Sequence, residues 1–149
     1  PFFDKGGEFY HGMTYDGHPV ASAVALKNIE ILQDEKMVDR VAELAPHFNA
    51  MLKGLEDHPI VGETRSVGLI GALELTCDKA GRGRFHDSGR VGTICRDHCF
   101  NAGLIMRACW DTMVLAPPFC ISRKEIDEIG RLARIALDKT YADVKAEVA

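Results

Sequence analysis

The order of hydrophobic patterns along the chain restricts its fold more than any other feature of the sequence. Two stretches with apolar residues at helical spacing come first, over about residues 18–34 and 36–55. Two short strand-like runs follow at 60–65 and 69–76, then a helical stretch over about 90–101, two more runs at 104–109 and 113–116, and a last helical stripe after 122. This order predicts an α+β fold, in which a long helix precedes a small antiparallel sheet of about four strands with helices packed on one face.

Helix signals in the first part of the chain are strong but include one conflict. Pro19 suits a first helical turn, because its missing N–H is not needed there, and Asp16 or Gly17 is the predicted cap. Pro46 lies in the middle of the second helical stretch. Because proline removes an intrahelical hydrogen bond, we expect a kink or a short break at that position.

The second part of the chain carries clearer boundary signals. Ser122 and Glu125 stand three residues apart before the last stripe, which is the spacing of a capping box. Gly103 suits the position that follows a helix end. The pair Trp110-Asp111 separates two strand-like runs, so we expect a hairpin there.

Composition narrows the class of protein. A chain of 149 residues with 46% hydrophobic and 27% charged residues is typical of a globular domain, and its net charge of −4 gives no reason to expect nucleic acid as a partner. No apolar run of about 18 residues predicts a membrane helix. Five cysteines at irregular spacing favour free thiols and a cytoplasmic location. Because the chain starts at Pro1, we expect it to begin inside a longer protein.

The segment HGMTYDGHPVASAVALKNIEIL, residues 11–32, resembles the HG-aromatic-T-x-x-GHP motif of class III transaminases, which depend on pyridoxal 5′-phosphate (PLP). The resemblance continues through VGLIGALEL (67–75), GLIMR (103–107), VLAPPFCIS (114–122) and EID (125–127), in the right order. Met13 departs from the motif, because the family usually has an aromatic residue there. The segments are most similar to the group that uses amines or ω-amino acids with pyruvate.

This resemblance implies a fold-type I enzyme, a homodimer with shared active sites. Residues 1–34 would correspond to the end of the large domain, with the phosphate-contact loop and a connecting helix, and residues 35–149 to the C-terminal small domain. The Schiff-base lysine would lie upstream, so we expect no catalytic residue in this chain and no activity from the chain alone. None of its eight lysines sits in the family's Schiff-base motif: Lys5, Lys27, Lys36, Lys53, Lys79, Lys124, Lys139 and Lys145.

Thr14 and Gly12 are the candidate cofactor contacts. A phosphate prefers hydroxyl and backbone N–H donors near a helix N-terminus, and Thr14 lies shortly before the predicted helix at Pro19. The resemblance implies that Thr14 binds the PLP phosphate of the other subunit, whereas the residue alone favours a threonine in a turn or at a helix entry. Gly12 would let the backbone approach a ligand closely.

Arg107 and Trp110 are the candidate substrate contacts. The planar fork of a guanidinium matches a carboxylate, and the resemblance implies that Arg107 is the mobile arginine that binds the substrate carboxylate. Without the resemblance, Arg107 is a solvent-exposed arginine at a strand end. Trp110 follows three residues later and suits either a pocket wall or a hairpin cover.

Three further patterns receive structural interpretations. Cys95, His98 and Cys99 lie within one helical turn, but no second pair completes a zinc site, so no metal is expected. The loop Gly81–Arg84 lacks a P-loop pattern and is interpreted as a solvated connection. Arg65 and Glu74 are expected to form an ion pair.

The sequence therefore predicts part of a PLP-dependent aminotransferase that moves an amino group from an amine or ω-amino acid to pyruvate or another 2-oxo acid. Two alternatives stay open. One is a free-standing, non-catalytic α+β module that binds a ligand or partner. The other is a different class III member, such as diaminopelargonate, 4-aminobutyrate or ornithine transaminase.

Overall fold

The computed structural model describes residues 12–148, and the chain divides into two compact units with the boundary between Lys36 and Met37. The first eleven residues, which include Lys5, and Ala149 lie outside the described residues. No helix of the described chain combines the length and the apolar character needed to cross a lipid bilayer.

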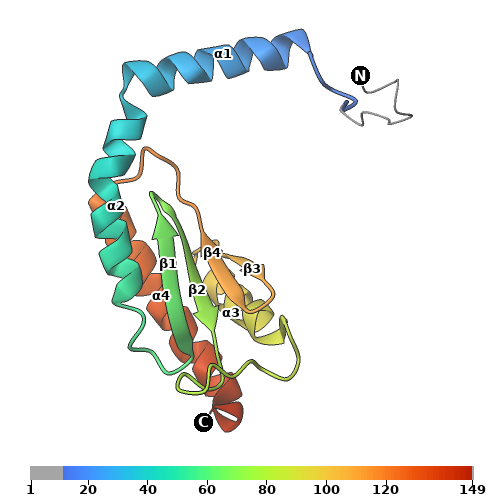
Figure 1. Cartoon of the computed structure of the whole chain (residues 1–149), viewed down its shortest axis with the longest axis vertical. Helices are drawn as coiled ribbons and strands as arrows, with labels where there is room; N and C mark the ends of the chain where they lie inside the picture. Colours follow the sequence, from blue (N-terminus) through green and yellow to red (C-terminus); the bar gives the residue numbers. More distant parts are fainter. Residues whose placement is uncertain (1–11, 149) are drawn as a thin grey trace, which may run out of the picture. The chain divides into compact units, whose positions relative to one another are not determined.

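The first unit contains α1 (Pro19–Asp34) and the turn before it (Figure 1). The helix begins where predicted, but the predicted cap was wrong. His18 is the N-cap, and its Nδ1 accepts the N–H of Ala21 at 3.4 Å. Asp16 is engaged elsewhere, because its carboxylate accepts the N–H of Met13 at 3.0 Å. Gly17 has φ +71°, a left-handed conformation that leads the chain into the cap.

The second unit opens with α2 (Met37–Lys53), which runs through Pro46 without interruption. The predicted break is therefore absent. Leu44, Phe48 and Leu52 are buried on both sides of the proline and anchor the helix in the core. Burial of such side chains contributes about 1.5–3 kcal/mol each, which together offset the cost of one proline in a helix.

Four strands form one antiparallel sheet in the order β1 (Val61–Val67), β2 (Ile70–Leu75), β4 (Thr112–Leu115) and β3 (Arg107–Cys109). The remaining helices are α3 (Arg90–Asn101) and α4 (Arg123–Val144), followed by a short 3-10 turn at Lys145–Glu147. Of these helices, α2 packs against β1 and β2, α3 against β3 and β4, and α4 against α2 and α3 (Figure 1). The predicted α+β class, with helices on one face of a small antiparallel sheet, is confirmed.

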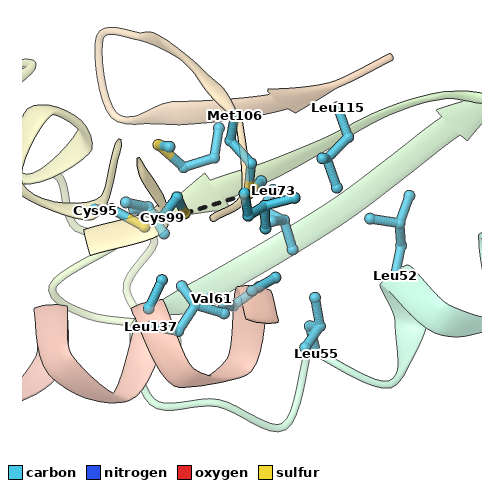
Figure 2. Close-up of a cluster of buried hydrophobic side chains, with 14 of the residues drawn as sticks. Leu52, Leu55, Val61, Leu73, Cys95, Cys99, Met106, Leu115 and Leu137 are labelled. Carbon is cyan, nitrogen blue, oxygen red and sulfur yellow. Dashed lines mark hydrogen bonds between the residues drawn. The ribbon is translucent and has the colours of Figure 1, made fainter. Parts of the chain in front are cut away.

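The hydrophobic core lies between the sheet and these helices. Leu73 and Leu115 point inward from the sheet, Leu52 comes from α2 and Leu137 from α4 (Figure 2). The thiol of Cys99 lies 3.6 Å from the sulfur of Met106 in the same cluster. One side of the sheet is therefore committed to packing.

Among residues 37–148, no helix covers the opposite side of the sheet, which we call the open face (Figure 1). Directly opposed residues of antiparallel strands share a face. Arg107 opposes Val114, Val114 opposes Ala72, and Ala72 opposes Arg65. These four residues form one row across the open face, from the edge strand β3 to the edge strand β1.

The helix boundaries predicted for α3 and α4 are confirmed. Gly103, at φ +83°, follows α3, and the N–H of Leu104 bonds the carbonyl of Cys99 at 2.9 Å, as expected for a glycine-terminated helix. At α4, the Ser122 side chain accepts the N–H of Glu125, and the Glu125 carboxylate accepts the N–H of Ser122 at 2.7 Å.

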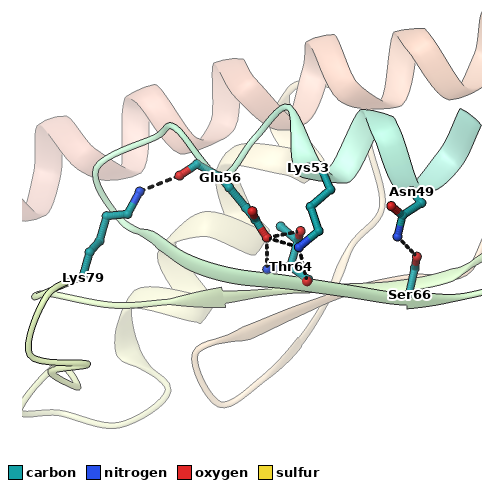
Figure 3. A network of polar contacts seen from close by, with 6 residues as sticks. All are labelled: Asn49, Lys53, Glu56, Thr64, Ser66 and Lys79. Carbon is teal, nitrogen blue, oxygen red and sulfur yellow. Dashed lines mark hydrogen bonds and ion pairs between the residues drawn. The ribbon is translucent and has the colours of Figure 1, made fainter.

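A polar network joins the end of α2 to β1 (Figure 3). One carboxylate oxygen of Glu56 lies 2.6 Å from Lys53 Nζ and 2.8 Å from the backbone N–H of Thr64. The bond from Lys53 and those from Thr64 lower the pKa of Glu56 from 4.5 to about 2. Lys79 also donates to the carbonyl of Glu56, so the loop after β2 is tied to the same turn.

Candidate functional site

Arg107 begins β3 and is exposed at the edge of the open face. Its neighbour across the strand is the aliphatic Val114, which offers the guanidinium no partner. Within residues 12–148, no hydrogen bond or ion pair engages the Arg107 side chain. The guanidinium is therefore free to bind a planar anion such as a carboxylate.

The arginine at the other end of the same row is already paired. Arg65 Nη2 lies 3.1 Å from Glu74 Oε2, which confirms the predicted ion pair. The same oxygen accepts the hydroxyl of Thr112 at 2.8 Å. The charge of Glu74 is therefore paired with Arg65, whereas Arg107 has no such partner among residues 12–148.

Trp110 occupies the tip of the β3–β4 hairpin, which confirms the predicted turn at Trp110-Asp111. Its backbone has φ +57°, and its side chain is 74% exposed. It helps to line a cavity of about 440 Å³, which we call the sheet-end cavity, together with Glu74, Leu75, Arg84, Ser88, Cys109, Asp111 and Thr112. Arg107 is not among the described residues that line this cavity, so the two predicted substrate contacts do not share it.

Asp111 is a buried residue that the sequence did not identify. Its carboxylate accepts the backbone N–H of Gly89 at 2.9 Å and that of Gly92 at 2.8 Å. These groups lie at the start of α3, whose N-cap Gly89 has no side chain of its own. A residue of the hairpin thus caps a helix that ends ten residues earlier in the chain. N-cap preferences favour Ser88, which lies immediately before Gly89. The sequence therefore predicts Ser88 as the cap and gives no signal for Asp111.

A second cavity of about 570 Å³ adjoins the first and shares Glu74, Leu75 and Arg84 with it. It includes the loop predicted to be a solvated connection. That loop is a compact turn, in which the N–H of Gly83 bonds the carbonyl of Asp78 at 2.8 Å. Lys79 donates to the carbonyl of His58 at 3.2 Å as well as to that of Glu56. Its ammonium is therefore occupied in a structural role.

Thr14 lies in a turn before α1, where the N–H of Asp16 bonds the carbonyl of Met13 at 3.0 Å. Its side chain is exposed and faces no partner within residues 12–148. A Cβ at Gly12 would meet nothing within 4 Å, so the described residues supply no packing reason for a glycine there. The segment fits one hydroxyl contact to a phosphate such as that of PLP, but it lacks the donors to hold the whole cofactor.

The cysteine and histidine cluster on α3 has other roles. His98 Nε2 lies 2.7 Å from Asp143 Oδ2 and links α3 to α4, while Cys95 and Cys99 are buried in the core. Among the residues that the structure describes, no three histidine, cysteine or acidic side chains form a group able to hold a metal ion.

Comparison with known proteins adds the family context. The profile described as "Aminotransferase class-III" matches residues 2–136. The putrescine–pyruvate aminotransferase of Pseudomonas aeruginosa is 56% identical over 144 residues, which cover 96% of this chain and 31% of that protein. The mitochondrial gamma aminobutyrate transaminase 1 of Solanum lycopersicum is 41% identical over 142 residues, covering 95% of this chain and 28% of that protein.

Solved structures agree with the fold. A thermostable omega transaminase mutant from Pseudomonas jessenii superposes with a TM-score of 0.84 at 34% identity, covering 96% of this chain and 32% of that one. A PLP-bound aminotransferase mutant from Vibrio fluvialis superposes with a TM-score of 0.83 at 36% identity, covering 96% and 31%. The chain spans about a third of the length of the curated relatives that it matches.

Proposed function

This chain belongs to the class-III aminotransferases, a PLP-dependent family, and on that premise we propose that it supplies the substrate-carboxylate contact and one phosphate contact of a transaminase that uses pyruvate as amino acceptor. The complete active site belongs to a longer protein, a homodimer in which the two subunits share their sites. The observation that carries the proposal is the exposed guanidinium of Arg107 on the open face of the sheet, which no side chain of residues 12–148 engages.

Arg107 binds the carboxylate of the 2-oxo acid. A bidentate pair between guanidinium and carboxylate fixes the orientation of the acid as well as its position. The neighbouring Val114 adds apolar surface without a competing charge. When the bound molecule is an amine without a carboxylate, the long arginine side chain has no partner on the open face and turns to solvent.

Thr14 donates its hydroxyl to the phosphate of PLP, and Gly12 keeps the backbone beside it unobstructed. PLP, when bound, supplies the electron sink for amino-group transfer. The donor set around Thr14 is too small to retain the cofactor by itself. The lysine that carries PLP lies outside this chain, so the 149 residues alone are inactive.

The amine donor is a diamine or an ω-amino acid. The relative named for putrescine and pyruvate is more similar to this chain than the relative named for gamma aminobutyrate, at 56% against 41% identity. We therefore propose putrescine as the preferred donor and 4-aminobutyrate as the second candidate. Comparing kcat/KM for these two donors in the complete enzyme decides between them.

The experiment that tests the carboxylate role is Arg107→Ala in the complete, PLP-loaded enzyme. Loss of a charged hydrogen-bonded pair costs about 1.5–3 kcal/mol, so the KM for pyruvate should rise by about tenfold to a hundredfold. The KM for an acceptor aldehyde, which has no carboxylate, should stay near its original value.

Arg96→Ala is the matched control, because Arg96 is an exposed arginine on α3 that pairs with its neighbour Asp97 at 2.8 Å. This variant should leave both KM values unchanged. Equal effects of Arg107→Ala on pyruvate and on the aldehyde would contradict the assignment of Arg107.

A further inference from the structure

We infer that Asp111 is a positioning residue, which holds the β3–β4 hairpin tip on the start of α3 and thereby fixes Trp110 as the wall of the sheet-end cavity that limits the size of the bound amine. The link to an amine rests on the proposed function. The positioning itself rests only on the contacts described below.

Asp111 is bonded as an anchor. Both oxygens of its carboxylate are used, with Oδ2 accepting from Gly89 at 2.9 Å and Oδ1 from Gly92 at 2.8 Å. Backbone N–H groups at a helix N-terminus bind a negative charge well, because the helix dipole adds to the two hydrogen bonds. The hairpin tip is therefore held on α3 at two points by one side chain.

The two glycines at the start of α3 make this contact close. A Cβ at Gly92 would lie 2.0 Å from the carbonyl oxygen of Trp110 and 3.1 Å from Cα of Asp111. No side chain fits there unless the hairpin moves away. At Gly89, a Cβ would lie 3.5 Å from Cε3 of the Trp110 ring, so the indole rests beside the helix start.

Trp110 is held in a conformation that its residue type disfavours. A left-handed backbone, here at φ +57°, is rare for a bulky residue and is energetically unfavourable. Burial of the ring does not offset this unfavourable conformation, because the residue is 74% exposed. Backbone strain is typical of residues that contact ligands, and Trp110 lies beside a cavity of about 440 Å³.

The chain contains a single tryptophan, so its fluorescence reports on Trp110 alone. Time-resolved anisotropy of the 149-residue chain therefore measures directly how firmly the ring is held. In Asp111→Asn the amide keeps one acceptor but turns an NH₂ group toward the second N–H. We expect the slow anisotropy component of Trp110 to lose most of its amplitude, while far-UV circular dichroism keeps its helical signal.

Two further variants separate positioning from general damage to α3. Asp143→Asn removes the negative charge that faces His98 at the other end of α3 and should leave the anisotropy as in the unaltered chain. Gly92→Ala keeps the Asp111 carboxylate but forces the hairpin away, and should free the ring as Asp111→Asn does. An unchanged anisotropy in both Asp111→Asn and Gly92→Ala would overturn the inference. A loss in Asp143→Asn equal to that in these two variants would also overturn it.

The role as a wall is tested in the complete, PLP-loaded enzyme. Trp110→Ala and Asp111→Asn should both raise the ratio of kcat/KM for a bulky aromatic amine to that for a small aliphatic amine. An unchanged ratio in Trp110→Ala would contradict the role of Trp110 as a cavity wall. A change in Trp110→Ala without one in Asp111→Asn would contradict the positioning role of Asp111. The anisotropy measurement uses neither cofactor nor substrate. Its result for Asp111 therefore holds even if the Arg107 experiment contradicts the proposed function.

Discussion

Arg65 and Arg107 lie on one row of the sheet but differ in whether a carboxylate pairs with them. Arg65 is neutralised by Glu74 at 3.1 Å, whereas Arg107 faces Val114. Both are strand residues with exposed side chains, and the ion pair of Arg65 with Glu74 was predicted from the sequence. The strand register explains the difference, because the diagonal neighbour is the carboxylate Glu74 for Arg65 but the uncharged Thr112 for Arg107.

The phosphate role of Thr14 predicts a specific loss in the complete enzyme. Thr14→Ala removes one hydroxyl donor to a charged group, which is worth about 1.5–3 kcal/mol. PLP should dissociate about tenfold or more faster, as measured by the loss of bound-cofactor absorbance during dialysis. Thr14→Ser keeps the hydroxyl and should retain PLP as the unaltered enzyme does. Equal retention in the alanine variant would remove Thr14 from the phosphate site.

The strained backbone of Trp110 predicts a gain in stability. Trp110→Gly supplies a residue that adopts positive φ at low cost, and the exposed indole gives up little burial. The free energy of unfolding of the 149-residue chain should rise by about 1 kcal/mol, as measured by urea denaturation. Trp110→Ala keeps a Cβ and should gain less. A loss of stability in the glycine variant would show that the ring contributes packing after all.

At the scale of elements, the start of α4 and the end of α3 were predictable, whereas the cap of α1 was assigned to the wrong residues and the distant cap of α3 was not identified. Ser122 and Glu125 form the capping box of α4, and Gly103 marks the end of α3. Both signals are local in the sequence. The start of α3 is capped by Asp111, which lies far along the chain and becomes a partner only after the hairpin folds. The uninterrupted α2 differs from expectation for a related reason, because core packing around Pro46 is not a local property.

Ser122 and Ser88 form a matched pair for testing this distinction. Ser122→Ala removes the side chain that accepts the N–H of Glu125 and should lower the free energy of unfolding by about 1 kcal/mol. Ser88 precedes α3, but the cap at Gly89 receives no bond from a neighbouring side chain. Ser88→Ala should therefore change the free energy of unfolding by less than about 0.5 kcal/mol. Equal effects would contradict the capping from Asp111.

At the scale of the molecule, the class and order of elements followed from the sequence, but the site did not. Alternating strands and amphipathic helices determine which residues face the core, and that pattern is local. The sheet order, the open face and the separation of Arg107 from the sheet-end cavity arise from pairing between distant segments. The candidate residues could be named from the motif, whereas their partners required the fold.

Acid should weaken the fold in two ranges of pH, which begin below 6.5 for His58 and below 4.5 for Glu56. Burial lowers the pKa of His58 below its usual 6.5, so the folded chain binds this proton less well than the unfolded chain, and stability falls as the pH drops below 6.5. The pKa of Glu56 is lowered from 4.5 to about 2, chiefly by Lys53 and then by Thr64. Its contribution is complete above 4.5 and is lost between 4.5 and about 2.

Glu56→Gln tests the lower range, because glutamine keeps an acceptor for Thr64 but carries no charge. The free energy of unfolding of this variant, measured by urea denaturation from pH 6 downward, should depend less on pH between 4.5 and 2 than that of the unaltered chain. The slope above pH 4.5, where the contribution of Glu56 is complete, should be the same in both. Parallel curves throughout the acid range would contradict the role of Glu56.

The most direct test of the central claim is the visible absorption of PLP, recorded with the 149-residue chain and with the longer polypeptide that contains it. We predict that the longer form shows the band of lysine-bound PLP and that an amine donor bleaches it, while the 149-residue chain shows only free cofactor. A longer form without such a band would contradict the assignment as part of a transaminase. A stable, amine-sensitive band in the 149-residue chain would contradict the claim that its own lysines take no catalytic part.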